Sequence, residues 1–536
     1  MANVGFLSLP TELICYILFL LTPRDLCRCA IAACKTFRDA AQNCVRIQHK
    51  LELFARGIIE TTTQDSIQYF KTNSSLKKFV FMSQSDFHVN TIFQKAVAAA
   101  PTTTKEAQFM KYGLWWTSRE EDLLIQECNT NTRTWPNHNL SPMPQHVLAP
   151  VIVDPLQDLV ITISLPRFVL VNVHNVKQDH HVFWLEFRML SSQIPHEDLA
   201  CTSLDCKHYF DARGNYDVVC MKEPAVYGDR IVVPYYTHTD NRWRKTMFIQ
   251  VIDWRKGQAK SHNLGYQIES SGDQIKVHLI DQQTFVVIDL DGVIMLYTLQ
   301  ELDGSPQHRI SYFFPTCTSA RAPSCIVHTT PSFPGAVVRP DLVPNSVPSL
   351  ESQIMVLEMA LPAVPMILVI DMIIFSEKNL HPHTAVSVPW SDWGPRYTCC
   401  FPHDPSHRIS VFGSRMAYAL PRYRTPAPGH RLEALSTNGR FYVHIWDFNE
   451  RVIARSKNFS GFDSPGLLIY KPARLVHPGY NRDFTSDHFY SATVCHASFP
   501  TRDFQGLFLE QDRLTLTWVR PDVIDIQVVS PVLERQ

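Results

Sequence analysis

The opening of the chain has the apolar spacing of a short helix. Pro10 suits the first turn of that helix, and the carboxylate of Glu12 lies near its positive end. Apolar residues then recur three and four positions apart, as they do on one side of a helix: Leu13, Ile14, Ile17, Leu18 and Leu21. This pattern predicts an amphipathic helix. An ordinary helix of a protein core gives a similar stripe, so the pattern alone does not specify a function.

Two further helices are predicted downstream. Thr22, Pro23 and Asp25 have the spacing of a helix start, with Thr22 as the N-cap and a variant of the capping box. The apolar side of this second helix comprises Leu26, Cys29, Ala30 and Ala33. A third pattern, which Gly57 is positioned to end, runs through Phe37, Ala41, Cys44, Ile47, Leu51 and Phe54. Three such short helices cannot bury this much apolar surface among themselves, so we expect a partner or close docking onto the later chain.

These residues also carry a family resemblance. The segment from Leu9 to Leu18 reads LPTELICYIL and is followed by Leu21, Asp25-Leu26, Cys34-Lys35 and Phe37-Arg38. Over residues 6–50 it resembles the F-box, a three-helix module that binds the adaptor Skp1. Residues 47–57 and 154–159 resemble segments of fungal F-box proteins. The resemblance implies a set of Skp1-binding residues, of which the last two would pack the end of the module: Leu9, Pro10, Leu13, Ile17, Leu18, Leu21, Leu26, Cys34 and Phe37.

From residue 151 onward the pattern changes to short runs rich in β-branched and aromatic residues, bounded by turn residues. Asp291-Gly292 is a strong hairpin turn between two of them. Because no helical pattern separates the runs, we expect antiparallel sheet. The predicted strands are Leu159–Ile163, Phe183–Leu190, Ile231–Tyr236, Met247–Trp254, Thr284–Leu290, Val293–Thr298, Ile354–Leu357, Met366–Phe375, Arg408–Phe412, Phe441–Trp446, Leu514–Val519 and Val523–Val529.

Three runs are similar to the third strand of a propeller blade: residues 248–254, 293–297 and 441–447. The last contains Trp446-Asp447, the dipeptide of the WD40 repeat, although the spacing of the runs is irregular. The predicted fold class is therefore α+β multidomain. It comprises a three-helix F-box at residues 1–50, a helical linker at 51–150 and a mostly β region at 151–536. We predict that this region is a degenerate β-propeller, with a β-sandwich as the alternative.

The composition is that of a folded globular protein. Of 536 residues, 45% are hydrophobic and 19% are charged, which argues against disorder. Fifty Lys and Arg against 51 Asp and Glu give a net charge of −1, so no global field recruits nucleic acid or anionic lipid. The 36 Pro against 19 Gly favour sheet and turn over long helices.

We predict no signal peptide and no transmembrane segment. The apolar run at 13–21 is too short to span a bilayer, and no Lys or Arg precedes it. The second apolar stretch, 354–375, contains charged residues and prolines, and it is predicted to form two buried strands. The 14 Cys are irregularly spaced, unlike the disulfide framework of a secreted protein. We therefore expect an intracellular protein of the cytoplasm or the nucleus.

The sequence contains few motifs that carry chemistry. It lacks the G-x-S-x-G of a nucleophile elbow, the phosphate-binding G-x-x-x-x-G-K-[ST] and the dinucleotide-binding G-x-G-x-x-G. Cys and His residues gather twice without the paired C-x-x-C spacing of a zinc site: Cys399, Cys400, His403 and His407 with His381 and His383, and Cys201, Cys206 and His208. We interpret both groups as buried thiols and loop histidines, and we predict no metal, cofactor or catalytic residue.

The F-box resemblance implies a non-catalytic adaptor, the substrate-recognition subunit of an SCF-type cullin-RING ubiquitin ligase. The helical module would bind Skp1, and through it a cullin, while the β domain would bind an unknown protein substrate. The alternative is an F-box scaffold that acts outside degradation. The sequence indicates no substrate-binding residue, and we expect no nucleic-acid or membrane partner.

Overall fold

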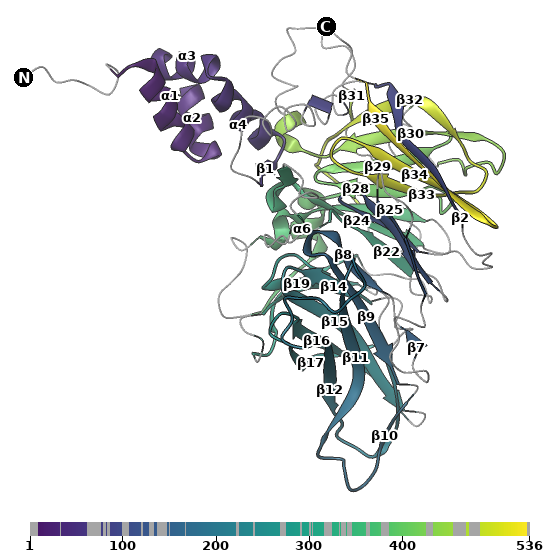
Figure 1. The fold of residues 1–536 in the computed structure, drawn as a ribbon. Coiled ribbons are helices and arrows are strands. Elements are labelled where there is room, and N and C mark those ends of the chain that lie inside the picture. The colour runs from purple at the N-terminus through teal and green to yellow at the C-terminus, as the bar shows by residue number, and fades with distance from the viewer. Residues whose placement is uncertain are drawn as a thin grey trace, which may run out of the picture.

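The computed structural model shows an N-terminal lobe of helices joined to a large β region (Figure 1). The described residues are 9–32, 34–61, 77–78, 82, 86–98, 107–118, 122–127, 133–136, 147–148, 151–166, 168–220, 224–239, 242–268, 275–289, 292–299, 302, 304–315, 324–331, 333, 339, 346–360, 365–376, 385–424, 432–453, 468–470 and 483–532. Among these, no helix is both long enough and apolar enough to cross a membrane.

Four short helices form the N-terminal lobe: α1 (Thr11–Leu20), α2 (Pro23–Ala32), α3 (Lys35–Asn43) and α4 (Val45–Ala55). The first two are confirmed at their predicted positions. The prediction of one third helix was wrong, because Cys44 has φ −93° and ψ 109°, an extended conformation that separates α3 from α4. Gly57 follows α4 with φ +67°, a left-handed conformation that favours glycine and ends the helix as predicted.

The described β region contains seven sheets of four to six strands, which we number as blades 1 to 7 in ring order. Blade 1 has β3 (Gln108–Lys111), β4 (Leu114–Ser118), β5 (Asp122–Glu127) and β6 (Arg133–Pro136). Blade 2 has β7 (Val147–Leu148), β8 (Ile152–Asp154), β9 (Leu159–Leu165), β11 (Asp179–Met189) and β12 (Ser203–Tyr209). Blade 3 has β10 (Val169–Val171), β13 (Gly214–Cys220), β14 (Ala225–Tyr227), β15 (Arg230–Thr239), β16 (Arg242–Asp253) and β17 (Gln258–Ile268).

The remaining four blades complete the ring. Blade 4 has β18 (Ile275–Leu279), β19 (Thr284–Asp289), β20 (Val293–Thr298), β21 (Gln307–Phe313) and β26 (Val386–Val388). Blade 5 has β22 (Ser324–His328), β24 (Ile354–Ala360), β25 (Met366–Asp371) and β27 (Thr398–Pro402). Blade 6 has β28 (Ile409–Phe412), β29 (Arg415–Leu420), β30 (Arg440–Asp447), β31 (Leu468–Tyr470) and β32 (Tyr490–Pro500). Blade 7 has β2 (Val89–Ala98), β33 (Phe504–Leu509), β34 (Leu514–Arg520) and β35 (Val523–Pro531).

Blade 7 closes the ring, because it combines the two ends of the β region. β2 pairs antiparallel with β35, so that Val89 lies opposite Pro531 and Ala98 opposite Val523. The last three strands of the chain are thereby joined to a strand that precedes blade 1. This pairing joins the last blade to the segment that precedes the first, so the seven sheets form a closed propeller.

Seven clusters of buried apolar side chains lie at the interfaces between neighbouring blades. Leu123 and Val160, for example, belong to the cluster between blades 1 and 2. Val286 and Leu357 belong to the cluster between blades 4 and 5. Each of the other five neighbouring pairs, including blade 7 with blade 1, has its own cluster. The hydrophobic core of the propeller therefore consists of the interfaces between neighbouring blades, arranged in a ring.

The strands predicted from residue 151 onward are present, including β24 and β25 in the 354–375 stretch. The prediction of strand over Met366–Phe375 was wrong for its last four residues, because β25 ends at Asp371 and residues 372–375 form a 3-10 helix. The three runs similar to a third propeller strand are β16, β20 and β30. Each lies third in a four-strand meander of its blade: β13-β15-β16-β17, β18-β19-β20-β21 and β28-β29-β30-β32. The hairpin β19–β20 forms as expected, although Asp291 lies outside the described residues.

The prediction of a helical linker over residues 51–150 holds for the end of α4 but not for residues 89–148, where the described elements are strands. β2 to β6 lie within it and supply blade 1 and one strand of blade 7. The predicted boundary at residue 151 falls inside blade 2, since β7 and β8 both pair with β9. Alternating apolar runs of four to six residues, such as Leu114–Ser118, are too short to distinguish a buried strand from a helical turn.

The remaining regular elements are short. α6 (Trp390–Tyr397) packs Trp390 and Trp393 into the cluster between blades 4 and 5. The described residues also include the 3-10 turns η3 (Pro155–Gln157), η6 (Leu350–Ser352) and η7 (Met372–Phe375). β1 (Ile58–Glu60) pairs with β23 (Ser346–Pro348) in a two-stranded sheet that connects the helical lobe to the propeller.

Candidate functional site

One side of α1 forms the core of the helical lobe. Ile14 and Leu18 are 1% and 2% exposed, one helical turn apart. They contact a small buried cluster contributed by the other three helices: Leu26, Ala40, Ala41 and Ile47. This packing uses the side of α1 that points into the lobe.

The opposite side of α1 is also apolar, and it is exposed. Leu13, Tyr16 and Leu20 are 50%, 63% and 66% exposed, and Ile17 between them is half-buried. Their spacing of three, four and seven positions places them on one stripe of the helix. α1 is thus apolar on two sides, and only one of them is covered by this chain.

Polar contacts hold the ends of α1 and α2 in place. The Nζ of Lys50 donates to the carbonyl oxygens of Phe19 (2.7 Å) and Leu21 (2.8 Å) at the end of α1. The same ammonium lies 4.9 Å from the centroid of the Phe19 ring. At the start of α2, the predicted capping box is present: the N–H of Asp25 donates to Oγ1 of Thr22 at 3.2 Å. These contacts fix the orientation of the exposed stripe.

The structure separates the predicted Skp1-binding residues into three groups. Leu13, Pro10 and Cys34 are exposed, and Leu9, Ile17, Leu21 and Phe37 are half-buried. Leu18 and Leu26 are buried inside the helical lobe, where they pack against other apolar side chains. The resemblance to the F-box implied that Leu18 of α1 and Leu26 of α2 face the partner.

Two exposed residues of the stripe, Tyr16 and Leu20, were missed from the sequence. The signal was present, because residues 13–21 contain no polar position at which a solvent face could form. A helix of this kind must be covered on more than one side. Phe19, which is 38% exposed beside Lys50, extends the apolar surface at the same end of α1.

The helical lobe is attached to the propeller at the end of α4. The side-chain amide of Asn449 donates to the carbonyl of Ala55 (3.2 Å), and Nη1 of Arg451 donates to the carbonyl of Phe54 (3.0 Å). The Arg451 guanidinium also lies 4.3 Å from the centroid of the Phe54 ring. Carbonyl groups at a helix end lack intrahelical partners, so these donors cap α4 from the propeller side.

Backbone pairing continues this joint beyond α4. The carbonyl of Gly57 accepts from the N–H of Ser349 (2.8 Å) and from Oγ of Ser352 (2.7 Å). Ile58 then lies opposite Pro348 in the β1–β23 pair and packs with Leu53 against Phe412. Together these contacts fix the direction in which the lobe leaves the propeller (Figure 1).

The Trp-Asp dipeptide of β30 supports this joint. Asp447 is buried, and one carboxylate oxygen accepts from Oγ of Ser414 (2.7 Å) and from the N–H of Asn449 (3.0 Å). Asn449 is thereby oriented so that its amide reaches α4. Trp446 packs in the cluster between blades 5 and 6. In this chain the dipeptide positions the helical lobe.

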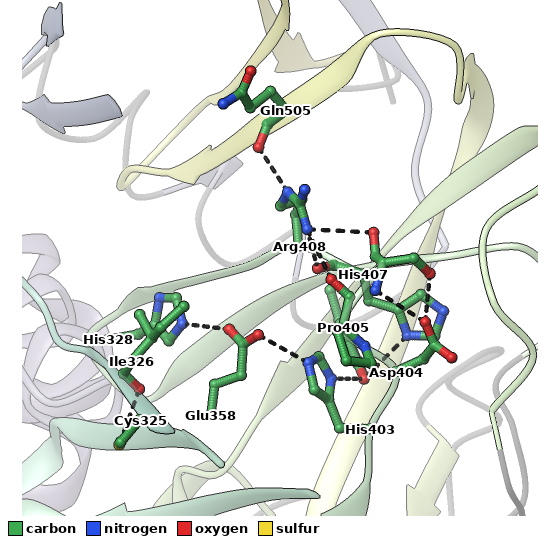
Figure 2. A network of polar contacts seen from close by, with 12 residues as sticks. Cys325, Ile326, His328, Glu358, His403, Asp404, Pro405, His407, Arg408 and Gln505 are labelled. Carbon is green, nitrogen blue, oxygen red and sulfur yellow. Dashed lines mark hydrogen bonds and ion pairs between the residues drawn. The ribbon is translucent and has the colours of Figure 1, made fainter. Parts of the chain in front are cut away.

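A network of polar side chains lies between blades 5 and 6 (Figure 2). The carboxylate of Glu358 accepts from Nε2 of His328 (3.0 Å) and of His403 (3.1 Å). Burial alone would raise the pKa of Glu358, but these two hydrogen bonds and the positive charge they bring hold it below its usual range. Glu358 is therefore a buried carboxylate with both oxygens occupied.

The cluster continues from His403 to Tyr418 and His407. The Tyr418 hydroxyl lies 2.8 Å from Nδ1 of His403 and 3.3 Å from Nδ1 of His407. His407 Nε2 must donate to the carbonyl of Glu433 (2.8 Å), so its Nδ1 accepts the Tyr418 proton and His403 donates to the Tyr418 oxygen. Burial lowers the pKa of His407 to about 4. All these groups are saturated by one another, and the arrangement supports the blade interface.

The cysteines and histidines that suggested zinc are placed apart. Cys399 and Cys400 are neighbours on β27, but Cys399 packs between blades 5 and 6 and Cys400 between blades 4 and 5. Burial raises the pKa of the Cys399 thiol to about 12. Among the described residues no group of three His, Cys, Asp or Glu side chains could hold a metal ion. His381 and His383 lie outside the described residues.

Comparison with known proteins identifies the helical lobe. Residues 6–51 match the family model described as F-box-like, so the chain carries an F-box-like domain followed by a seven-blade propeller-like domain. A search of curated protein sequences gives no match. The family model covers the helical lobe alone.

Solved structures with similar folds are distant. The AfRom2 CNH domain is 9% identical with a TM-score of 0.31, over 85% of this chain and 99% of that one. A chain of the yeast heterotrimeric Nup82-Nup159-Nup116 nucleoporin complex is 9% identical with a TM-score of 0.34, over 81% and 99%. A prolyl endopeptidase is 8% identical with a TM-score of 0.35, over 90% and 52%. At these TM-scores we draw no conclusion from the similarity.

Proposed function

We propose that this chain is the substrate-recognition subunit of an SCF-type cullin-RING ubiquitin ligase. The F-box-like lobe binds Skp1, and through it a cullin, while the propeller binds the protein to be modified. The observation that carries this proposal is the exposed apolar stripe of α1, formed by Leu13, Tyr16, Ile17 and Leu20, on a domain that matches the F-box-like family model.

The energetics of this stripe support a partner. Fully burying a Leu or Ile side chain contributes roughly 1.5–3 kcal/mol, and this contribution is lost while the side chain stays in water. A soluble chain seldom exposes several such side chains on one helix unless a partner covers them. Leu13 and Leu20 at the two ends of the stripe define a contact about two helical turns long. Leu18 and Leu26 support that contact from inside the lobe, and the remaining predicted residues border it.

The chain contributes to ubiquitin transfer by positioning. In this role it holds a lysine of the bound substrate near the thioester of the conjugating enzyme, which raises the effective concentration of the attacking amine. No catalytic group of this chain is required. The joint at Asn449, Arg451 and Gly57 supports this role, because a fixed angle between lobe and propeller limits where the substrate is presented.

Reconstitution with purified Skp1, cullin and RING subunit tests the proposal. The triple variant Leu13→Ala, Ile17→Ala, Leu20→Ala removes apolar surface from the stripe and should lower the affinity for Skp1 at least a hundredfold, since hot-spot truncations cost about 2 kcal/mol or more each. The matched control is the double variant Leu170→Ala, Val173→Ala. It removes exposed apolar side chains from β10 of blade 3 and from the turn that follows β10. The control should bind Skp1 normally.

Three outcomes decide the proposal. Assembly of Skp1, cullin and the intact chain, lost in the triple variant, supports the ligase role. Retention of Skp1 by the triple variant contradicts the assigned surface. Binding of Skp1 without recruitment of cullin contradicts the ligase role and favours an F-box scaffold that acts outside degradation.

A further inference from the structure

Two cysteine thiols of the helical lobe lie against each other. Cys15 is on α1, and Cys44 is the extended residue between α3 and α4. The Cys15 thiol forms a hydrogen bond with the Cys44 thiol. Both cysteines are free, and both side chains are half-buried. The lobe therefore contains a pair of neighbouring thiols that come from segments far apart in the sequence.

A shared backbone acceptor fixes the two cysteines beside each other. The carbonyl oxygen of Ala40 accepts from Sγ of Cys15 (3.6 Å) and from the N–H of Cys44 (3.1 Å). The sulfur of Cys15 and the backbone of Cys44 thus meet at one oxygen atom of α3. The two thiols are neighbours because of the way α1 packs against the end of α3.

Further contacts hold the segment that carries Cys44. The carbonyl of Cys44 accepts from the N–H of Gln48 (3.0 Å), and the side-chain amide of Gln48 donates to the carbonyl of Ala41 (2.7 Å). Cys15 and Cys44 also pack against the buried apolar cluster of the lobe. Because the thiols are already in hydrogen-bond contact, rotation of the two side chains brings the sulfurs toward the disulfide bond length of about 2 Å.

We propose that Cys15 and Cys44 form a reversible disulfide when the chain reacts with a peroxide. The peroxide oxidises the Cys44 thiol to a sulfenic acid and is itself reduced to water when the peroxide is hydrogen peroxide. The Cys15 sulfur then attacks the Cys44 sulfur, the S–S bond forms, and the hydroxyl group leaves with the Cys15 proton as a second water. A small dithiol reduces the bond and restores both thiols.

The surroundings of Cys15 indicate the order of these steps. Burial, and then the neighbouring Cys44 thiol, raises the pKa of the Cys15 thiol. Cys15 therefore stays protonated and donates its hydrogen bond, whereas peroxide reacts with the thiolate form of a cysteine. We accordingly assign the first oxidation to Cys44 and the second step to Cys15, which acts as the resolving thiol.

The disulfide ties α1 covalently to the link between α3 and α4. In the reduced chain, α1 is held by the packing of Ile14 and Leu18 and by the hydrogen bonds from Lys50. A cross-link restricts the unfolded segment, so the bond stabilises the lobe against local opening. In a reducing compartment such bonds are transient. The pair is therefore a redox switch of lobe stability, and this inference does not depend on the proposed function.

Peptide mapping of the full chain tests this proposal, because trypsin separates the two cysteines. Residues 1–24 contain Cys15 as their only cysteine, and residues 39–46 contain only Cys44. The folded chain is treated with hydrogen peroxide, the remaining thiols are alkylated in denaturant, and the chain is digested without reductant. We expect these two peptides to be linked to each other and to be released by dithiothreitol.

Serine variants provide the controls. Cys15→Ser should abolish the linked peptide and leave a Cys44 sulfenic acid, which dimedone traps in residues 39–46. The matched control is Cys27→Ser, which removes another half-buried thiol from α2 and should leave the link intact. Amide exchange in α1 should become at least about tenfold slower in the cross-linked chain. Exchange in peroxide-treated Cys15→Ser should not slow.

Three results would overturn the proposal. The first is a peroxide-treated chain in which both peptides remain unlinked. The second is a link from either peptide to residues 29–35, which contain Cys29 and Cys34. The third is unchanged amide exchange in α1 of the cross-linked chain. Neither Skp1 nor cullin is present in these measurements, so their outcome is separate from that of the proposed function.

Discussion

The helical lobe and the propeller differ in how much of their apolar surface they bury. In the propeller, both faces of a blade are covered by the neighbouring blades, and side chains such as Val286 and Leu357 are completely buried. In the lobe, α1 has an equally apolar sequence, but only Ile14 and Leu18 are covered. The propeller is a closed ring, whereas the lobe leaves one apolar side of α1 exposed.

This difference is the basis for the proposed Skp1-binding surface. An exposed Leu is common on protein surfaces and needs no explanation by itself. A stripe on one helix, whose other side already supplies a sufficient core, does need one. The contacts from Lys50 and Thr22 hold that stripe in a fixed position before any partner binds, so little conformational entropy is lost on binding.

The largest expected effect is a loss of propeller stability as the pH falls. Burial lowers the pKa values of His208, His407 and His444 to about 4, so these groups are neutral in the folded propeller at neutral pH. Their contribution to stability is present above pH 6.5 and is lost as the pH falls from 6.5 to 4, because the unfolded chain binds the extra protons. Burial also lowers the pKa of His278 to about 4, which makes four such histidines. Burial raises the pKa of Asp371 to about 6, and a hydrogen bond with Glu450, against the effect of burial, raises that of His488; these two groups act in the opposite direction over part of this range.

Tryptophan fluorescence follows the unfolding of the propeller and not of the helical lobe, because none of the ten tryptophans lies in residues 1–57. The urea midpoint followed by tryptophan fluorescence should therefore fall steeply between pH 6.5 and 4.5. The variant His444→Gln should flatten this dependence. A midpoint that stays constant or rises over this range would contradict the assignment of neutral buried histidines.

Substitutions on the two sides of α1 should separate stability from binding. Leu18→Ala leaves a cavity in the core of the lobe and should cost about 2–5 kcal/mol of its free energy of unfolding. Leu20→Ala, its exposed counterpart, should change that free energy by less than about 0.5 kcal/mol while weakening Skp1 binding. Thermal unfolding followed by helical circular dichroism measures the stability of each variant. A titration with Skp1 measures its affinity. Equal stability losses for the two variants would remove the distinction between the two sides.

Gly57→Ala should loosen the joint between the two regions. A Cβ at this position would lie 2.0 Å from Oγ of Ser352, and the φ of +67° adds strain, so we expect a cost of about 1–3 kcal/mol. Amide exchange in α4 and β1 should become faster, while the Skp1 affinity of the lobe stays unchanged. The double variant Gly57→Ala, Ser352→Gly relieves the clash. Amide exchange in α4 and β1 should then be slower than in the single variant. Unchanged exchange in the single variant would show that the joint is not rigid.

Thr22→Ala should have the smallest effect. It removes the side chain that caps α2 and should cost about 1 kcal/mol of lobe stability. Thr22→Ser retains the capping hydroxyl and should be close to the unmodified chain in thermal unfolding. If the alanine and serine variants unfold at the same temperature, the capping box does not contribute to the orientation of α1.

Much of the fold could be predicted from the sequence, because strands in this region are short, apolar and bounded by turns. Residues 441–447 specified the third strand of a blade on their own. The number of blades could not be predicted. Closure depends on β2, which pairs with residues more than 400 positions later, and local patterns carry no information about such a distant partner.

The candidate site was predicted in position but not in detail. The spacing in residues 13–21 indicated a helix with more apolar surface than the short helices can bury, and the exposed Leu13, Tyr16 and Leu20 agree with that. It did not separate the buried Leu18 from the exposed Leu20, because in a helix apolar on all sides the spacing does not indicate which side the lobe covers. The contact between Cys15 and Cys44 has no local signal, since these residues are far apart in the sequence and meet only through the packing of α1 against α3.

Side-chain oxidation footprinting of the chain, alone and with purified Skp1, tests the central claim most directly. Leu13, Tyr16 and Leu20 should be oxidised readily in the free chain and protected in the complex, while Tyr209 on the propeller should react equally in both. Stable binding of Skp1 with no protection of these three α1 side chains would contradict the claim.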